Sequence, residues 1–147
     1  MNRLEPGAIC FELTETIAVH DIQVAAEFVL ACKAIGIRFA LDDFGTGSSS
    51  FGYLRHLPVD YLKIDGGFVK DIEDDSVDLA MVETINRIGH ILGMRTIAEC
   101  AENEAIIERL REIGVDYAQG YGVSMPAPLL APGGMHLLSR DDEERRR

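Results

Sequence analysis

Basic residues are scarce in this chain of 147 residues, where 14 lysines and arginines stand against 25 aspartates and glutamates, for a formal net charge of −11. Proteins that bind nucleic acids in general need a basic surface. The acidic balance therefore argues against general nucleic-acid binding. It does not exclude an anionic nucleotide as a ligand, because divalent cations can lie between carboxylates and phosphates.

Apolar runs of the length of a membrane span, about 18 residues, are also missing, so no membrane span is expected. The chain has only three cysteines, Cys10, Cys32 and Cys100, and their spacing fits no metal motif. An odd number of cysteines without a signal peptide predicts reduced thiols in a cytoplasmic protein.

Apolar runs that end in polar residues recur along the chain, and helical patterns separate them. Residues 22–35, 78–92 and 103–113 carry apolar residues at helical spacing, and a shorter helix is expected between the second and third runs. The alternation predicts an α/β protein with about five parallel strands. The polar residues at the five run ends are Glu12 with Glu15, Asp42 with Asp43, Lys63, Glu99 with Glu102, and Gln119.

Five strands that each end in a polar residue favour a TIM-type (β/α) barrel over an open doubly wound sheet. In a barrel the strand ends converge on one mouth, whereas an open sheet gathers its site at one switch point. Both architectures remain possible from the pattern alone. In either one, the polar residues are expected at the same end of the sheet.

The adjacent pair Asp42-Asp43, followed by a Gly/Ser loop, is the strongest candidate site. Neighbouring carboxylates repel unless a cation lies between them, which favours a metal site over a simple Asx turn. Lys63 either faces inward, paired with acids because a bare buried charge is costly, or reaches solvent at the rim. Glu102 also suits the first turn of the following helix, where an acid complements the helix dipole.

These motifs resemble the EAL domain, the family of cyclic di-GMP phosphodiesterases of bacterial second-messenger signalling. The resemblance runs from about residue 8 to residue 130, and its most specific part is the double-aspartate loop. The matching segments are Phe11–Thr16 (Glu-x-Thr-Glu), Asp42–Ser50 (the double-aspartate loop), Leu62–Asp65 (the catalytic lysine), Ile97–Glu102, and Gln119–Tyr121 with Pro126.

The resemblance implies two-metal hydrolysis of one phosphodiester bond of cyclic di-GMP, which gives linear pGpG, with Mg²⁺ or Mn²⁺ as the cofactor. It implies metal ligands at Glu12, Asp42, Asp43 and Glu99, with Asp42 bridging the ions. Lys63 would contact the attacking water, and Gln119 would contact the substrate or position the water. Glu15 and Glu102 would hold the Asp43–Ser50 loop, which in the family also takes part in dimerisation.

Several departures from the family qualify this expectation. Neither Glu-Ala-Leu nor the family's Asn-bearing strand occurs here, and Cys100 and Ala101 replace the usual Gly and Val. A complete barrel of eight strands typically needs about 250 residues. Residues 1–130 are therefore predicted to be the C-terminal part of such a barrel, lacking its N-terminal strands, and 131–147 a charged, disordered tail.

Three functional interpretations follow. The first is a truncated phosphodiesterase of low or no activity alone. The second is a non-catalytic module, derived from an EAL domain, that binds nucleotide or a protein partner. The third is another metal-dependent (β/α) phosphohydrolase. With unpaired strands expected at Ala8–Leu13 and Val115–Gln119, the chain is also expected to self-associate or to take strands from a partner chain.

Overall fold

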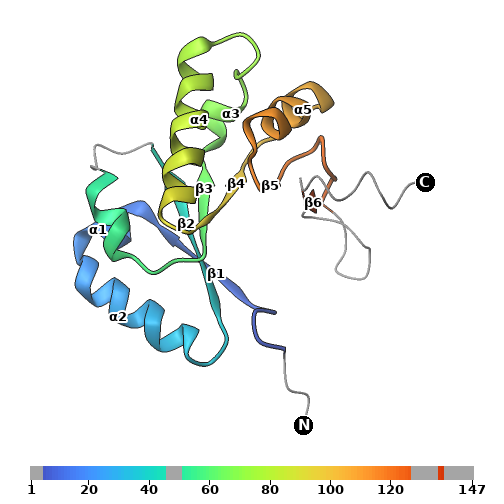
Figure 1. Ribbon diagram of the computed structural model, residues 1–147. Coiled ribbons are helices and arrows are strands. Elements are labelled where there is room, and N and C mark those ends of the chain that lie inside the picture. Colours follow the sequence, from blue (N-terminus) through green and yellow to red (C-terminus); the bar gives the residue numbers. More distant parts are fainter. Residues whose placement is uncertain (1–4, 46–50, 127–135, 138–147) are drawn as a thin grey trace.

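One curved sheet organises the protein, and in this computed structural model residues 5–45, 51–126 and 136–137 are described. Its strands follow one another in chain order (Figure 1). The first five pair in parallel, and the sixth is antiparallel to the fifth. The five predicted parallel strands are therefore confirmed. The strands are β1 (Cys10–Thr14), β2 (Arg38–Phe44), β3 (Tyr61–Ile64), β4 (Arg95–Ala98), β5 (Tyr117–Ala118) and β6 (His136–Leu137).

Helices connect the parallel strands. The three long predicted helices and the short one are present within a few residues of their expected bounds, and each long helix starts with an Asp or Asn side chain that accepts a backbone N–H. Two further short helices, α1 and α3, were not predicted. The helices are α1 (Glu15–His20), α2 (Ile22–Lys33), the 3₁₀ helix η1 (Phe51–His56), α3 (Gly66–Val69), α4 (Ser76–Ile91) and α5 (Glu104–Ile113).

The strand order favours barrel-type winding. Among the described strands, β1 to β5 never reverse their order, so the sheet has no switch point of the doubly wound kind. One face of the sheet packs on helices, with Phe39, Leu41, Leu62 and Ile64 at most 1% exposed. Since side chains alternate along a strand, Lys63 between Leu62 and Ile64 must point to the opposite face.

The two expected free strand edges differ. Within the described residues β1 pairs only with β2, so one of its edges is free. The prediction of a free edge at Val115–Gln119 is wrong, because the chain returns and adds β6 beside β5. That strand comes from the segment expected to be a disordered tail; the remaining residues of 131–147 lie outside the described residues.

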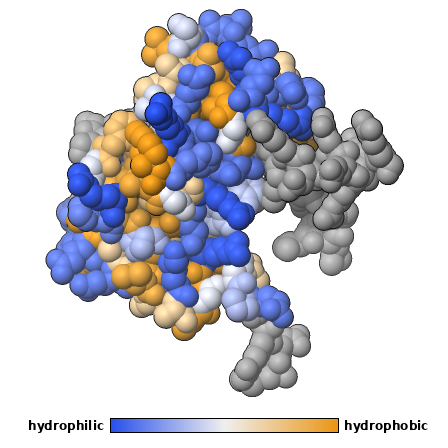
Figure 2. Space-filling view, in the orientation of Figure 1, coloured by the Kyte–Doolittle hydropathy of each residue, from blue (hydrophilic) through white to orange (hydrophobic). Residues whose placement is uncertain are grey.

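Phe39 and Leu41 are buried, because helices cover that side of the sheet. Exposed apolar residues are spread over several elements, and they include Phe11 on β1 and Phe28 on α2. Phe11 and Phe28 are 45% and 54% exposed, and both pack edge-to-face on Phe39. Figure 2 shows apolar patches over the half of the molecule that carries α1 and α2. None of the helices in the described part of the chain has the length and hydrophobicity needed to cross a bilayer.

Candidate metal centre

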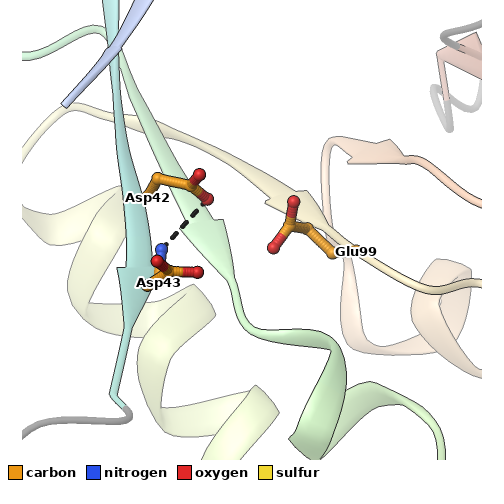
Figure 3. A group of neighbouring side chains, drawn as sticks. All are labelled: Asp42, Asp43 and Glu99. Carbon is orange, nitrogen blue, oxygen red and sulfur yellow. Dashed lines mark hydrogen bonds between the residues drawn. The ribbon is translucent and has the colours of Figure 1, made fainter. Parts of the chain in front are cut away.

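Three carboxylates meet at the carboxyl ends of β2 and β4. Asp42 and Asp43 belong to the end of β2, and Glu99 directly follows β4. One oxygen from each side chain lies within 4.8 Å of the others, a spacing that could hold a metal ion. Figure 3 shows the three side chains converging from the two strands. The register explains this meeting, because β2, β3 and β4 run parallel and end at the same edge.

The backbone of Asp43 allows two adjacent carboxylates to share one site. Side chains of neighbouring strand residues normally point to opposite faces. Asp43 departs from the strand with a φ of 57°, a left-handed conformation that Asp tolerates better than most residues. Its N–H donates to Asp42 Oδ1 at 3.0 Å. The local turn therefore holds both acids at the strand end, toward Glu99.

Lys63 lies at the centre of the acidic group. Its Nζ is 2.9 Å from Glu12 Oε1, 3.0 Å from Asp42 Oδ1 and 2.8 Å from Glu99 Oε1. The side chain is only 4% exposed, so the alternative of a solvent-reaching lysine is wrong. Burial alone would lower the pKa of Lys63, but the hydrogen bonds to Glu99, Glu12 and Asp42 outweigh it and raise the pKa. Lys63 is therefore a permanently charged cation among carboxylates.

Glu99 is the carboxylate with the strongest conflict between its charge and its surroundings. Burial raises the pKa of Glu99; the ion pair with Lys63 opposes this shift, and Asp42 and Glu12 add to it. A carboxylate whose ionised form is disfavoured by burial and like charge gains from a second cation. This is the electrostatic situation expected of a metal ligand.

The other predicted residues lie outside this group. Glu15 begins α1, is 5% exposed, and its Oε2 has no hydrogen-bond partner among the described residues. It lies close enough to Tyr53 to influence that residue: burial raises the pKa of Tyr53, and the charge of Glu15 raises it further. Glu15 was expected to hold the Asp43–Ser50 loop, but the Thr46–Ser50 part of that loop lies outside the described residues.

Glu102 and Gln119 are at the same end of the sheet without joining the carboxylates. Glu102 is 54% exposed and lies 3.9 Å from Lys70 Nζ. The alternative that placed it in the first turn of α5 is wrong, because Asn103 caps that helix and Glu104 provides the acid. Gln119 follows β5 and continues the ladder through its backbone, donating to Ala98 O at 2.8 Å.

The donor set fits a hard divalent cation. Asp42, Asp43 and Glu99 offer only carboxylate oxygens. Glu12 adds a fourth carboxylate, which forms an ion pair with the same lysine, Lys63. Oxygen ligands suit Mg²⁺ and Mn²⁺, whereas softer metals would favour His or Cys. The structure thus brings together Glu12, Asp42, Asp43, Lys63 and Glu99 from segments that are far apart in the sequence.

Reasoning from the sequence gave no role in the site to two residues near Glu99, which are Cys100 and Gly66. Cys100 has a φ of 54°, again left-handed, and it packs against buried Gly66 at the start of α3. The available signal was Cys100 itself, at a position where the resembling family carries Gly.

Comparison with known proteins agrees with these features. The family model for the EAL domain matches residues 1–126. The chain is 48% identical over 121 residues to cyclic di-GMP phosphodiesterase PdeB of Shewanella oneidensis, covering 82% of this chain and 14% of that protein. It is 37% identical to cyclic di-GMP phosphodiesterase PdeA of Borreliella burgdorferi, covering 82% and 18%.

Solved structures give the same picture. The PaMucR phosphodiesterase in complex with c-di-GMP superposes with a TM-score of 0.80 at 38% identity, over 86% of this chain and 51% of that chain. The EAL domain of Mycobacterium smegmatis DcpA gives 0.74 at 36% identity, over 80% and 53%. The chain therefore spans about half of these solved chains and less than a fifth of the two curated relatives.

Proposed function

This chain belongs to the EAL domain family, and from that membership and the geometry of the site we propose that it takes part in hydrolysing cyclic di-GMP to linear pGpG. One observation carries the proposal: Asp42, Asp43 and Glu99 converge within 4.8 Å beside the buried Lys63. Relatives named as cyclic di-GMP phosphodiesterases support the choice of substrate. Family membership also displaces the alternative of an unrelated metal-dependent phosphohydrolase.

The proposed chemistry assigns a task to each residue. Bound Mg²⁺ or Mn²⁺ would supply a water of lowered pKa and polarise the phosphoryl oxygens. Asp42 would bind both ions, Glu12 one of them, and Asp43 with Glu99 the other. Lys63, held by three carboxylates, would orient the attacking water and offset negative charge developing on the phosphate.

The remaining predicted residues would act around this centre. Glu15 and Glu102 would hold the Asp43–Ser50 loop, and the buried position of Glu15 favours such a task over contact with solvent. Gln119, exposed after β5, would contact the substrate or position the water. We also propose a cytoplasmic location, since Cys10, Cys32 and Cys100 are all free thiols.

The test combines metal binding with product analysis. Calorimetry with Mn²⁺ should give binding heat for the wild-type chain and none for Asp42→Ala/Asp43→Ala, since the double variant loses two of three clustered carboxylates. With Mn²⁺ present, the 147-residue chain should form pGpG roughly 10³-fold or more slowly than a complete EAL domain. The reason is that its residues include no Glu-Ala-Leu segment.

Each outcome has a clear meaning. Equal Mn²⁺ binding by both proteins would remove the metal-site proposal. Normal turnover by the 147-residue chain would show that the Glu-Ala-Leu segment is not needed. Metal or nucleotide binding without any pGpG would favour the second candidate, a non-catalytic module in cyclic di-GMP signalling, which the lack of that segment supports.

We also propose that the free edge of β1 pairs with a second copy of the chain or with a partner chain. Within the described residues no strand pairs with this edge, and Phe11 on β1 and Phe28 on α2 are about half exposed. Light scattering over a concentration series should show a mass that rises for the wild type. Phe28→Asp should shift the protein toward monomer; a wild-type monomer at every concentration would refute this proposal.

A further inference from the structure

The segment that follows Glu99 lies in a narrow slot between glycines. On one side is Gly66: a Cβ atom placed on it would overlap Cys100 Sγ and lie 2.7 Å from Cys100 Cβ. On the other side is Gly120, whose added Cβ would lie 2.5 Å from the backbone N and O of Ala101. Neither position has space for a side chain. The slot therefore determines where this segment runs.

Hydrogen bonds hold the backbone in the same slot. Glu99 N donates to Ile64 O at 3.1 Å, which ties it to the end of β3. Ala101 N donates to Gln119 O at 3.0 Å, which ties it to the end of β5. Between these two bonds Cys100 adopts a φ of 54°, a conformation that side chains rarely favour. The turn that aims Glu99 is thus held from both neighbouring strands.

The contact between Gly66 and Cys100 joins the two strand ends that carry the central ion pair. Gly66 comes three residues after Lys63, and Cys100 comes directly after Glu99. The Lys63 Nζ–Glu99 Oε1 distance is 2.8 Å. Displacement of Cys100 would therefore change the position of the Glu99 carboxylate relative to Lys63 and the aspartates.

We infer that Gly66 and Cys100 are positioning residues, whose size-matched contact sets the place of the Glu99 carboxylate in the metal centre. In its metal-binding part, this inference rests on the proposed function. Gly66 acts by having no side chain, and Cys100 by filling the space that this leaves.

Mn²⁺ titration of four variants tests the inference. Gly66→Ala should weaken Mn²⁺ binding about 10- to 100-fold, the usual effect of losing a partner that orients a ligand. Cys100→Gly removes the atoms that the new methyl group would meet, so Gly66→Ala/Cys100→Gly should recover most of the affinity. Cys100→Gly alone should bind Mn²⁺ more tightly than Gly66→Ala. The matched control, Cys100→Ser, keeps a side chain of similar size and should stay within about 2-fold of wild type.

Three results would overturn the inference: wild-type affinity in Gly66→Ala, no recovery in the double variant, or Cys100→Gly binding no better than Gly66→Ala. If Gly66→Ala does not fold, the double variant must fold and bind, and its failure would also overturn the inference.

A second readout needs no metal and separates this inference from the proposed function. Lys63→Met and Glu99→Gln should be non-additive in urea unfolding of the wild type, because the two side chains interact directly. In the Gly66→Ala background their effects should become additive, and with Cys100→Gly added they should couple again. Unchanged coupling in Gly66→Ala would reject the positioning role. Absence of Mn²⁺ binding in the wild type, with the coupling lost as expected, would reject only the metal centre.

Discussion

Replacement of Lys63 by methionine is expected to lower the free energy of unfolding of the metal-free protein by about 2–4 kcal/mol. The side chain is 4% exposed and contacts Glu12, Asp42 and Glu99. Without it, Asp42 and Glu99 would remain as mostly buried like charges near each other. Because Glu12 is 54% exposed, water can solvate its charge when Lys63 is absent. The expected loss of stability is therefore smaller than for a fully buried ion pair. Urea unfolding at pH 7 measures the effect.

Lys70→Met is the matched control for charge removal. Lys70 is half exposed and lies 3.9 Å from Glu102, so its removal should change stability by at most about 0.5 kcal/mol. Mn²⁺ should recover part of the stability lost in Lys63→Met, because a bound cation would replace the missing positive charge beside the carboxylates. Equal stability of Lys63→Met and the wild type would contradict the central role of this lysine.

Replacement of Glu99 by glutamine is expected to reduce Mn²⁺ affinity by roughly 100-fold while leaving the metal-free protein at least as stable as the wild type. The loss of a charged ligand weakens the site more than the loss of an outer partner, which typically costs 10- to 100-fold. Burial disfavours the ionised form of Glu99, so removing the charge removes that cost. Calorimetry and urea unfolding of the same samples measure the two effects.

The pH dependence of stability tests independently whether the charge of Glu99 destabilises the folded protein. The pKa of Glu99 is raised in the folded state, so its ionisation costs stability at neutral pH. That cost disappears as the pH falls through the raised folded pKa, where the folded protein takes up the proton. The stability difference between wild type and Glu99→Gln should therefore shrink on acidification. Glu112→Gln, an exposed control on α5, should change neither stability nor Mn²⁺ affinity by much; a large loss of affinity there would mean that the effect of Glu99→Gln is not specific to the metal centre.

Much of the fold was predictable because its signals are local. The alternation of apolar runs and helical spacing depends on residues a few positions apart, and it predicted five parallel strands and their helices. Gly36, Gly93 and Gly114 each follow a helical stretch, and their positive φ angles of 89°, 78° and 84° are typical of glycines that end helices. The short helices α1 and α3 were missed because neither is long enough to show a period. β6 was missed because it has only two residues, and these form a strand by pairing with β5.

The identity of the acidic site residues could be predicted, but the arrangement of their side chains in space could not. Asp42-Asp43 and the strand-end positions of Glu12, Lys63 and Glu99 follow from the order of residues alone. Lys63 is 51 residues from Glu12, and only the packing of parallel strands brings their charged atoms to 2.9 Å. Glu15, which resembled the others in its pattern, lies in α1 beside Tyr53 because the chain turns into a helix directly after β1.

The order of residues alone was enough to identify the charged residues, the approximate ends of the strands and the family that the motifs resemble. The tertiary structure decided which of those residues meet, how deeply Lys63 is buried, and that Asp43 and Cys100 take left-handed conformations. The difference arises because the two kinds of interaction act over different separations along the chain. Propensity and periodicity act between near neighbours, whereas distances, burial and pKa depend on contacts between residues that are distant in the chain.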